Sequence, residues 1–335
     1  MTIRVLQVGL GPIGVGVLRQ VIDRPGFELA GAVDIDPAKA GKDVGEACGL
    51  GRSLGITVEA DLAAAVARDG IDVAVLCTGS ALERVLPQFE TVLASGLPVV
   101  STTEELAFPQ FAAPELTARL DAAAKEGGAA ILGTGVNPGF AMDLLPIALT
   151  APCERVDAVR IDRIQDASKR RIPFQVKIGS GMDPDDFRAK VDRGEMGHVG
   201  FTESVAMLAA AFGWKMDRIT DSIEPKVAEA PTESGLGTIG PGKVIGIIQD
   251  AVGYRDGETP IRLHMEAYLG APESYDEVRI EGSPSLRSRL EGGFPGDIAT
   301  ASIVVNCLPR ILQAPPGLIT MKDLPVAGWW SGEGS

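Results

Sequence analysis

A glycine-rich turn after the first apolar run constrains the fold of this chain more than any other feature. Residues 3–8 have the composition of a buried strand, and Gly9, Gly11 and Gly14 follow in the spacing G-x-G-x-x-G. In this spacing the first glycine permits a tight turn and the second lets the backbone approach a pyrophosphate. The third allows a helix to pack closely on the strand. The turn therefore predicts a dinucleotide-binding fold with its site at this loop.

The residues around the turn extend the predicted site. Pro12 and Ile13 open the expected helix, whose free N–H groups and positive dipole end attract phosphate. Asp34 ends the second apolar run, where a carboxylate accepts hydrogen bonds from the ribose hydroxyls of adenosine and repels a 2′-phosphate. This favours NAD(H) as the cofactor. Lys39 and Lys42 can meet such a phosphate, so NADP(H) stays open.

The first part of the chain alternates apolar runs with segments of helical pattern. Repeated strand–helix–strand units imply a doubly wound parallel sheet, here the Rossmann sheet of an α/β protein. The expected strands are residues 3–8, 27–33, 72–77, 98–101 and 129–132, and the expected helices are residues 13–22, 37–46, 61–68, 81–95 and 114–126.

After Pro138 the pattern changes, and apolar runs follow one another without regular intervening helices. Residues 261–269 alternate apolar and polar side chains, as in an antiparallel strand with one open face. The other expected strands are residues 160–165, 174–178, 219–227, 243–249 and 277–281, with helices near 183–192, 202–212 and 296–312. We therefore expect a Rossmann domain of residues 1–140, completed by 296–335. Residues 141–295 are expected to form an α+β substrate domain with a largely antiparallel sheet.

Composition excludes several classes of function. The net charge of −14 repels phosphate backbones and anionic membrane surfaces, so neither a nucleic acid nor a membrane is expected as a partner. The two histidines, His198 and His264, and four widely spaced cysteines predict no metal site. The chain shows no signal-peptide pattern and no uninterrupted apolar run of membrane-spanning length, so we expect a cytoplasmic protein.

Small residues after two of the expected strands are candidates for cofactor contact, because loops at this edge of a parallel sheet line the cofactor crevice. Thr78, Gly79 and Ser80 suit contact with the ribose on the nicotinamide side, or form only a tight turn. Asn137 lies in a run rich in glycine where a hinge between domains belongs. Its amide can orient a carboxamide or a substrate, or serve turn geometry alone.

Two adjacent carboxylates, Glu104 and Glu105, follow the strand at 98–101. A carboxylate placed beside an apolar wall can transfer protons to and from a substrate. Neighbouring residues on a turn point in different directions, so at most one of them faces a substrate. The alternative is that both are helix N-terminal acids, which the helix dipole favours.

Three segments of the sequence resemble those of a known protein family. They are Val-Val-Ser-Thr-Thr-Glu-Glu-Leu at 99–106, Gly-Thr-Gly-Val-Asn-Pro-Gly-Phe at 133–140 and Asp-Ala-Ser-Lys-Arg-Arg at 166–171. The chain resembles the 2,4-diaminopentanoate dehydrogenase and native amine dehydrogenase family, within the wider dihydrodipicolinate-reductase-like group. The resemblance continues through residues 197–201 to 315–320 and so covers nearly the whole chain.

This resemblance implies an NAD(P)H-dependent amine dehydrogenase. Such an enzyme aminates a ketone or aldehyde with ammonia through an iminium that is reduced by hydride transfer, and it deaminates amines in reverse. The resemblance assigns the family's catalytic glutamate to Glu104, with Glu105 as the second candidate. Pocket roles fall on Asn137, Phe140, Arg163 and His198, although a lone histidine in a turn is more often structural. A homodimer formed through the sheet of the second domain is also implied.

Two alternatives remain. A reductase of cyclic imines would need cationic anchors such as Arg163, Lys169, Arg170 and Arg171, but the paired histidines of dihydrodipicolinate reductases are absent here. A non-catalytic NAD(P) sensor would have no need of the glutamate pair. His264 lies on a polar strand face and is expected to be structural.

Overall fold

The computed structural model describes residues 2–332, and the chain forms two compact units. The first unit contains the residues up to Phe140 and those from Pro295 onward, and the second is Ala141–Phe294. Each unit contains one sheet.

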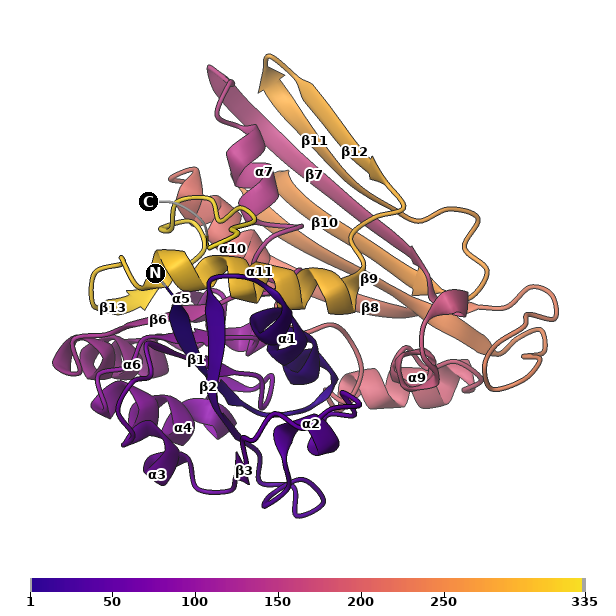
Figure 1. Cartoon of the computed structure of the whole chain (residues 1–335). Helices are drawn as coiled ribbons and strands as arrows, with labels where there is room; N and C mark the ends of the chain where they lie inside the picture. Colours follow the sequence, from indigo (N-terminus) through magenta and orange to yellow (C-terminus); the bar gives the residue numbers. More distant parts are fainter. Residues whose placement is uncertain (1, 333–335) are drawn as a thin grey trace. The chain divides into compact units, whose positions relative to one another are not determined.

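The first unit is built on a seven-stranded sheet in the order β13-β6-β5-β4-β1-β2-β3, in which every neighbouring pair is parallel (Figure 1). Its strands are β1 (Ile3–Val8), β2 (Phe27–Val33), β3 (Val58–Glu59), β4 (Val73–Leu76), β5 (Val99–Ser101), β6 (Ala130–Gly133) and β13 (Gly317–Ile319). The strand order reverses at β1, and doubly wound sheets bind dinucleotides at such a reversal. The predicted Rossmann sheet is confirmed.

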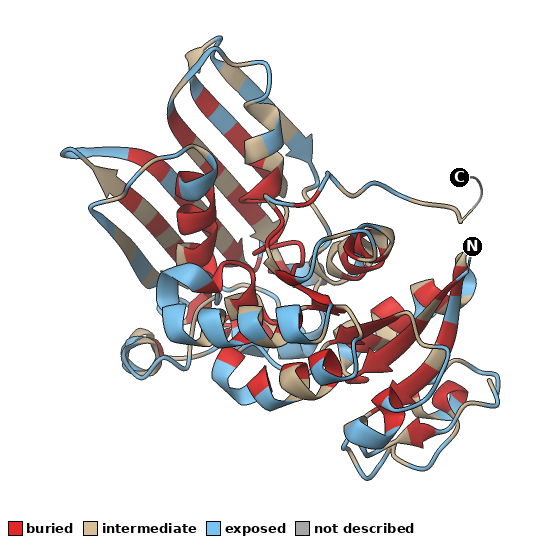
Figure 2. Ribbon diagram, turned by 90° about the vertical axis from the view of Figure 1, so that its left-hand side faces the viewer, coloured by how far each residue is buried: buried red, intermediate tan, exposed pale blue. Residues whose placement is uncertain are grey.

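Helices cover both faces of this sheet. They are α1 (Pro12–Asp23), α2 (Val44–Ala47), α3 (Leu62–Val66), α4 (Leu82–Ala94), α5 (Pro109–Ala112), α6 (Pro114–Glu126) and α11 (Gly296–Ile311), with a 3₁₀ turn η1 (Glu104–Leu106). Helix α1 packs on α11, whereas α4 packs on α3 and α6. Because both faces are covered, strands such as β4 are buried along their whole length (Figure 2).

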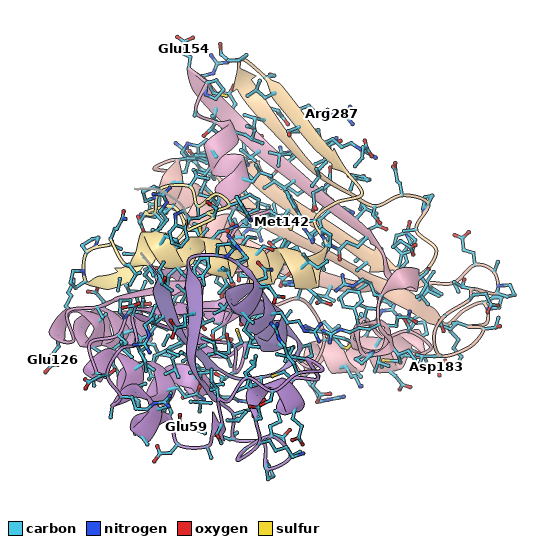
Figure 3. The ribbon with its side chains drawn as sticks, in the orientation of Figure 1. Glu59, Glu126, Met142, Glu154, Asp183 and Arg287 are labelled. Atoms are coloured by element: carbon cyan, nitrogen blue, oxygen red, sulfur yellow. The ribbon has the colours of Figure 1, made fainter. Side chains whose placement is uncertain are left out.

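The second unit contains a six-stranded sheet in the order β12-β11-β7-β10-β9-β8. Its strands are β7 (Arg155–Asp166), β8 (Arg218–Val227), β9 (Val244–Arg255), β10 (Glu258–Tyr268), β11 (Tyr275–Ser283) and β12 (Leu286–Glu291). Only β7 and β10 pair in parallel, so the predicted, largely antiparallel sheet is confirmed. In Figure 3, Glu154 lies immediately before β7, and Arg287 belongs to the edge strand β12.

One face of this second sheet is covered by α10 (Phe201–Ala211), which packs on β8, β9 and β10. Along β10 buried residues alternate with more exposed ones, and Figure 2 shows this alternation as bands across the sheet. The remaining helices of the unit are α7 (Leu144–Leu149), α8 (Ile172–Lys177) and α9 (Pro184–Asp192), with a 3₁₀ turn η2 (Ala167–Lys169).

Two predicted elements are wrong. Residues 174–178 are not a strand: 174–177 belong to α8 and Ile178 is its C-cap, because Pro173 in the first turn favours a helix start. The helix expected at 37–46 is reduced to the short α2, because Gly41 adopts a left-handed conformation with φ +81 and the Asp43 side chain accepts from the N–H of Gly45. The short strands β3, β12 and β13 were not predicted.

Candidate functional site

The glycine turn after β1 has the geometry of a dinucleotide cradle. Gly9 has φ +86, and a Cβ there would lie 2.6 Å from the carbonyl oxygen of Cys77. A Cβ at Gly14 would collide with the carbonyl oxygen of Gly9, so this glycine lets α1 approach the turn. A Cβ at Gly11 would meet no atom within 4 Å. The space above Gly11 is open, as the approach of a pyrophosphate requires.

No side chain of the cap or first turn neutralises the positive dipole end of α1. Gly11 is its N-cap residue and supplies no side-chain hydrogen bond, and no acidic residue lies in the first turn. Pro12 has no N–H, and the N–H groups of Ile13 and Gly14 come too early in the helix for an intrahelical partner. These groups and the positive dipole end are available to a phosphate.

Asp34 is fixed beside the same turn. Its carboxylate accepts from the backbone N–H of Leu10 at 2.7 Å and from that of Asp36 at 2.9 Å. Lys39 Nζ lies 3.2 Å from Asp34 Oδ2 and 3.1 Å from the carbonyl oxygen of Leu10. Burial raises the pKa of Asp34, but these hydrogen bonds outweigh it and hold the pKa below its ordinary value. The carboxylate is therefore ionised and oriented where an adenosine ribose is expected.

Hydrogen bonds join the loops that follow β4 and β5. Thr103 Oγ1 donates to the carbonyl oxygen of Gly79 at 2.8 Å, and the N–H of Glu105 donates to that of Ser80 at 3.3 Å. Thr78, Gly79 and Ser80 are exposed. The two loops are thus fixed to each other at the carboxyl ends of adjacent strands, on the edge of the sheet where the glycine turn lies.

The two neighbouring glutamates have different surroundings. Glu105 Oε2 accepts from the N–H of Leu82, the first residue of α4, at 2.7 Å. Glu105 therefore stabilises the N-terminus of α4, a helix other than the 3₁₀ turn to which it belongs. Between residues 2 and 332 the Glu104 carboxylate has no hydrogen bond or ion pair, and the residue is partly exposed. Its carboxylate is available to a substrate.

Asn137 carries unpaired polar atoms. The residue is only 6% exposed, and neither Oδ1 nor Nδ2 has a hydrogen-bond partner among the described residues. A buried polar group left unpaired costs about 1–3 kcal/mol, so a group outside the chain is expected to pair with this amide. Phe140 is partly buried and is the last residue of this stretch of the first unit.

In the second unit His198 lies in the loop before α10. Its Nδ1 is 2.8 Å from the carbonyl oxygen of Val199, so Nδ1 carries the proton and Nε2 carries a lone pair. Burial, aided by the charges of Lys177 and Arg163, lowers the pKa of His198 to about 4, although the hydrogen bond to Val199 opposes this shift. The ring is therefore neutral at pH 7. Nε2 has no partner in the described part of the chain and can accept a hydrogen bond.

Arg163 on β7 is buried and fully engaged. Its Nη1 donates to Asp276 Oδ1 at 2.8 Å and its Nη2 donates to the carbonyl oxygen of Phe294 at 3.0 Å. Asp276 in turn accepts from the N–H of Phe294 at 2.7 Å. The pair thus holds the last residue of the second unit, just before the chain crosses back to the first. Arg163 lies near enough to His198 to affect its pKa.

Comparison with known proteins places the chain in a family. Residues 140–334 match the family model of the 2,4-diaminopentanoate dehydrogenase C-terminal domain, and residues 3–110 match that of the dihydrodipicolinate reductase N-terminus. The chain is 34% identical to 2,4-diaminopentanoate dehydrogenase of Acetoanaerobium sticklandii, over 97% of this chain and 94% of that one. The chain belongs to the 2,4-diaminopentanoate dehydrogenase family. The predicted resemblance is confirmed.

Two further relatives agree. The amine dehydrogenase of Streptomyces virginiae is 26% identical over 95% of both chains. The solved structure of amine dehydrogenase from Mycobacterium smegmatis aligns with a TM-score of 0.86 and 28% identity, covering 99% of this chain and 98% of that one. As a member of the 2,4-diaminopentanoate dehydrogenase family, the chain is an oxidoreductase, and its first unit has the fold of NAD(P)-dependent dehydrogenases.

The described residues contain no group of three or more histidine, cysteine or carboxylate side chains that could hold a metal ion. No helix between residues 2 and 332 is both long and apolar enough to cross a membrane.

Sequence reasoning missed three residues that organise the site. Thr103 joins two loops, and the only signal for it is its place in the Ser-Thr-Thr run after β5. Gln249 and Asp221 lie behind the His198 loop. Gln249 is a fully buried polar residue on the apolar face of β9, and this break in the apolar pattern is the signal that could have revealed it.

Proposed function

We propose that the chain is an NAD(P)H-dependent amine dehydrogenase that converts a ketone or aldehyde and ammonia into an amine, and catalyses the reverse deamination. One observation carries this proposal: Glu104 presents an unpaired carboxylate on the same sheet edge as the glycine cradle. The names of the family relatives, 2,4-diaminopentanoate dehydrogenase and amine dehydrogenase, support the amine as substrate class.

The residues around β1 fit a dinucleotide. Gly11 would leave room for the pyrophosphate, the free N–H groups in the first turn of α1 would donate to it, and Asp34 would accept from the adenosine ribose. Asp34 favours NAD(H), while the neighbouring Lys39 can contact a 2′-phosphate and so permit NADP(H). When bound, the nicotinamide supplies hydride to the substrate carbon or accepts it in the reverse direction.

Glu104 is proposed as the proton-transfer group. Ammonium must lose a proton before it attacks a carbonyl, and the carbinolamine that forms must lose water to give an iminium. A carboxylate accepts the first proton and can return one to the leaving hydroxyl. The iminium is cationic, so an unpaired carboxylate nearby also stabilises it electrostatically.

The remaining predicted residues receive positioning roles in this proposal. The unpaired amide of Asn137 fits the carboxamide of the nicotinamide or a polar substrate group. Phe140 is proposed to contribute an apolar wall to the pocket. His198 Nε2 is proposed to accept a hydrogen bond from the amine or ammonia. Arg163 is proposed to support this region of the second unit through Asp276 rather than to bind an acidic substrate, because its guanidinium is already paired.

We propose a homodimer formed through the second sheet. The face opposite α10 carries ion pairs of mixed sign across neighbouring strands. Asp250 pairs with Arg262, and Glu277, only 3% exposed at its side chain, pairs with Arg287. A surface of alternating charge is self-complementary under a twofold axis. Light scattering should give twice the chain mass of 34.9 kDa, and a monomer would refute this part of the proposal.

The experiment that tests the proposed function follows NADH consumption at 340 nm with a panel of ketones and aldehydes, with and without ammonium. We expect consumption only when ammonium is present. Consumption of NADH with a cyclic imine in the absence of ammonium would instead support an imine reductase. Saturable NADH binding without any turnover across the panel would support a sensor and contradict the proposal.

A further inference from the structure

The backbone of His198 is held by a side chain from another element. Gln249 Oε1 accepts from the N–H of His198 at 2.7 Å, and Gln249 Nε2 donates to the carbonyl oxygen of the same residue at 3.0 Å. These two hydrogen bonds pair the Gln249 amide with the His198 backbone as two residues of neighbouring β-strands pair with each other. Gln249 is fully buried on β9, so the loop is fixed to the interior of the sheet.

The loop has little rigidity of its own. Gly197, with φ +120, directly precedes His198, and Gly200, with φ +99, follows two residues after it. Glycines in these conformations permit the turn, but they impose no unique backbone path. The Ile223 side chain lies where a Cβ at Gly197 would be, so the loop passes directly over β8. The paired bonds from Gln249 are therefore the main polar restraint on the backbone of His198.

Asp221 on β8 fixes the direction of the Gln249 amide. Gln249 Nε2 donates to both carboxylate oxygens of Asp221, at 3.1 and 3.0 Å. If the amide were rotated by half a turn, its oxygen would face the carboxylate and its NH₂ group would face the N–H of His198. Both contacts would be repulsive. The carboxylate and the His198 backbone therefore favour the same amide orientation.

The contacts that run from Asp221 through Gln249 end at the imidazole of His198. Because the backbone is fixed, Nδ1 of His198 reaches the carbonyl oxygen of Val199, and this bond keeps the lone pair on Nε2. The ring also lies against Phe201, with 5.6 Å between the ring centroids. A looser loop would let the ring turn and exchange the roles of its two nitrogens.

We propose that Gln249, oriented by Asp221, is a positioning residue that presents the Nε2 lone pair of His198 to the N–H groups of the amine or ammonia. This inference rests on the proposed function, in which His198 contacts the substrate nitrogen. Asp221 and Gln249 act only through His198 and do not touch the substrate.

The kinetic test uses Asp221→Ala, which removes the acceptor, and Asp221→Asn, which keeps one oxygen for Gln249. Asp221 is exposed at the residue level, so neither change opens a cavity in the core. We expect the alanine variant to raise KM for ammonium about tenfold without changing KM for NADH, and the asparagine variant to stay within about threefold of the wild type. Ser222→Ala, on the same strand but the opposite face, is the matched control and should leave both constants unchanged.

A double-mutant cycle then assigns the effect to His198. In a His198→Ala background, Asp221→Ala should cause no further increase in KM for ammonium, because the group it positions is absent. Additive effects would overturn the inference. An inactive wild-type enzyme would instead contradict the proposed function, so the two failures are distinguishable.

The chain offers a readout that does not depend on activity. It contains only two histidines, so protein labelled with ¹⁵N-histidine gives two imidazole patterns, and His264→Gln assigns them. The wild type should show His198 protonated at Nδ1 alone. Gln249→Ala and Asp221→Ala should shift it towards a mixture of tautomers, and Asp221→Asn should restore the wild-type pattern. An unchanged tautomer in both alanine variants would overturn the inference.

Discussion

Glu105 accepts a hydrogen bond from the backbone N–H of Leu82 at 2.7 Å, and this contact separates the roles of two adjacent glutamates. Leu82 is the first residue of α4, so the carboxylate satisfies an N–H that has no partner within its own helix. Glu104, one residue earlier, has no such partner in the range 2–332. The structure thus gives Glu105 a structural contact, and the Glu104 carboxylate has no hydrogen bond or ion pair among the described residues.

The first prediction concerns the stability that Glu105 provides. Glu105→Ala should lower the free energy of unfolding by about 1 kcal/mol, because a helix N-terminus loses its acceptor. Urea unfolding followed by circular dichroism measures this change. Glu105→Gln keeps an acceptor oxygen and is the control, expected to lose less. An alanine variant as stable as the wild type would show that the bond to Leu82 contributes nothing.

The second prediction compares two glycines of the cradle. Gly11→Ala should fold normally, because its Cβ meets no atom of the chain, but it should weaken NADH binding at least tenfold by occupying the pyrophosphate space. Gly14→Ala should destabilise the fold itself, because its Cβ collides with the carbonyl oxygen of Gly9. Thermal unfolding and NADH fluorescence titration separate the two effects. Tight NADH binding by the Gly11 variant would argue against the cradle.

The third prediction concerns cofactor preference. Asp34→Ala should raise KM for NADH and leave KM for NADPH unchanged or lower, because the carboxylate that contacts the ribose hydroxyls and repels a 2′-phosphate is gone. Lys39→Ala should weaken NADPH more than NADH, because Lys39 Nζ, 3.2 Å from Asp34, is the nearby cation. Steady-state kinetics with both cofactors give the ratios. Equal changes for the two cofactors in both variants would contradict these roles.

The fourth prediction concerns pH and stability. The hydrogen bond from His264 to Asp250, aided by Glu266, raises the pKa of His264 above its ordinary 6.5 despite partial burial. A pKa raised in the folded state stabilises the protein below pH 6.5, and this stabilisation is lost as pH rises through the folded-state pKa. The difference in unfolding free energy between wild type and His264→Gln should therefore shrink as pH rises above neutrality. A difference that is constant from pH 5 to 9 would contradict the assignment.

The sequence predicted the elements that follow simple periodic rules. The glycine turn, the buried parallel strands and the alternating strand β10 were all recognised, because glycine spacing and apolar periodicity act locally. The error at α8 arose because Phe174, Val176 and Ile178 alternate with polar residues as in a strand, whereas the helix start signal of Pro173 was overlooked. The edge strands β12 and β13 were missed because they are short and partly exposed.

Candidate site residues could be named from the sequence, but their contacts could not. The spacing of Glu104 and Glu105 did not distinguish them, and only the family resemblance favoured Glu104. Their different contacts depend on Leu82, more than twenty residues earlier in the chain. The resemblance gave Arg163 a pocket role, but its pairing with Asp276 could not be predicted because it depends on strand register far along the chain. The link from Asp221 through Gln249 to His198 likewise joins residues that no local pattern connects.

Ammonium-dependent oxidation of NADH by the Glu104→Gln variant tests the central claim most directly. The glutamine keeps the size of the side chain but cannot exchange a proton, so we expect kcat to fall by about 10²–10⁴-fold while NADH binding, measured by fluorescence titration, stays unchanged. Glu105→Gln, measured in parallel, should keep kcat within a few fold of the wild type. A Glu104→Gln enzyme that turns over at the wild-type rate would contradict the account.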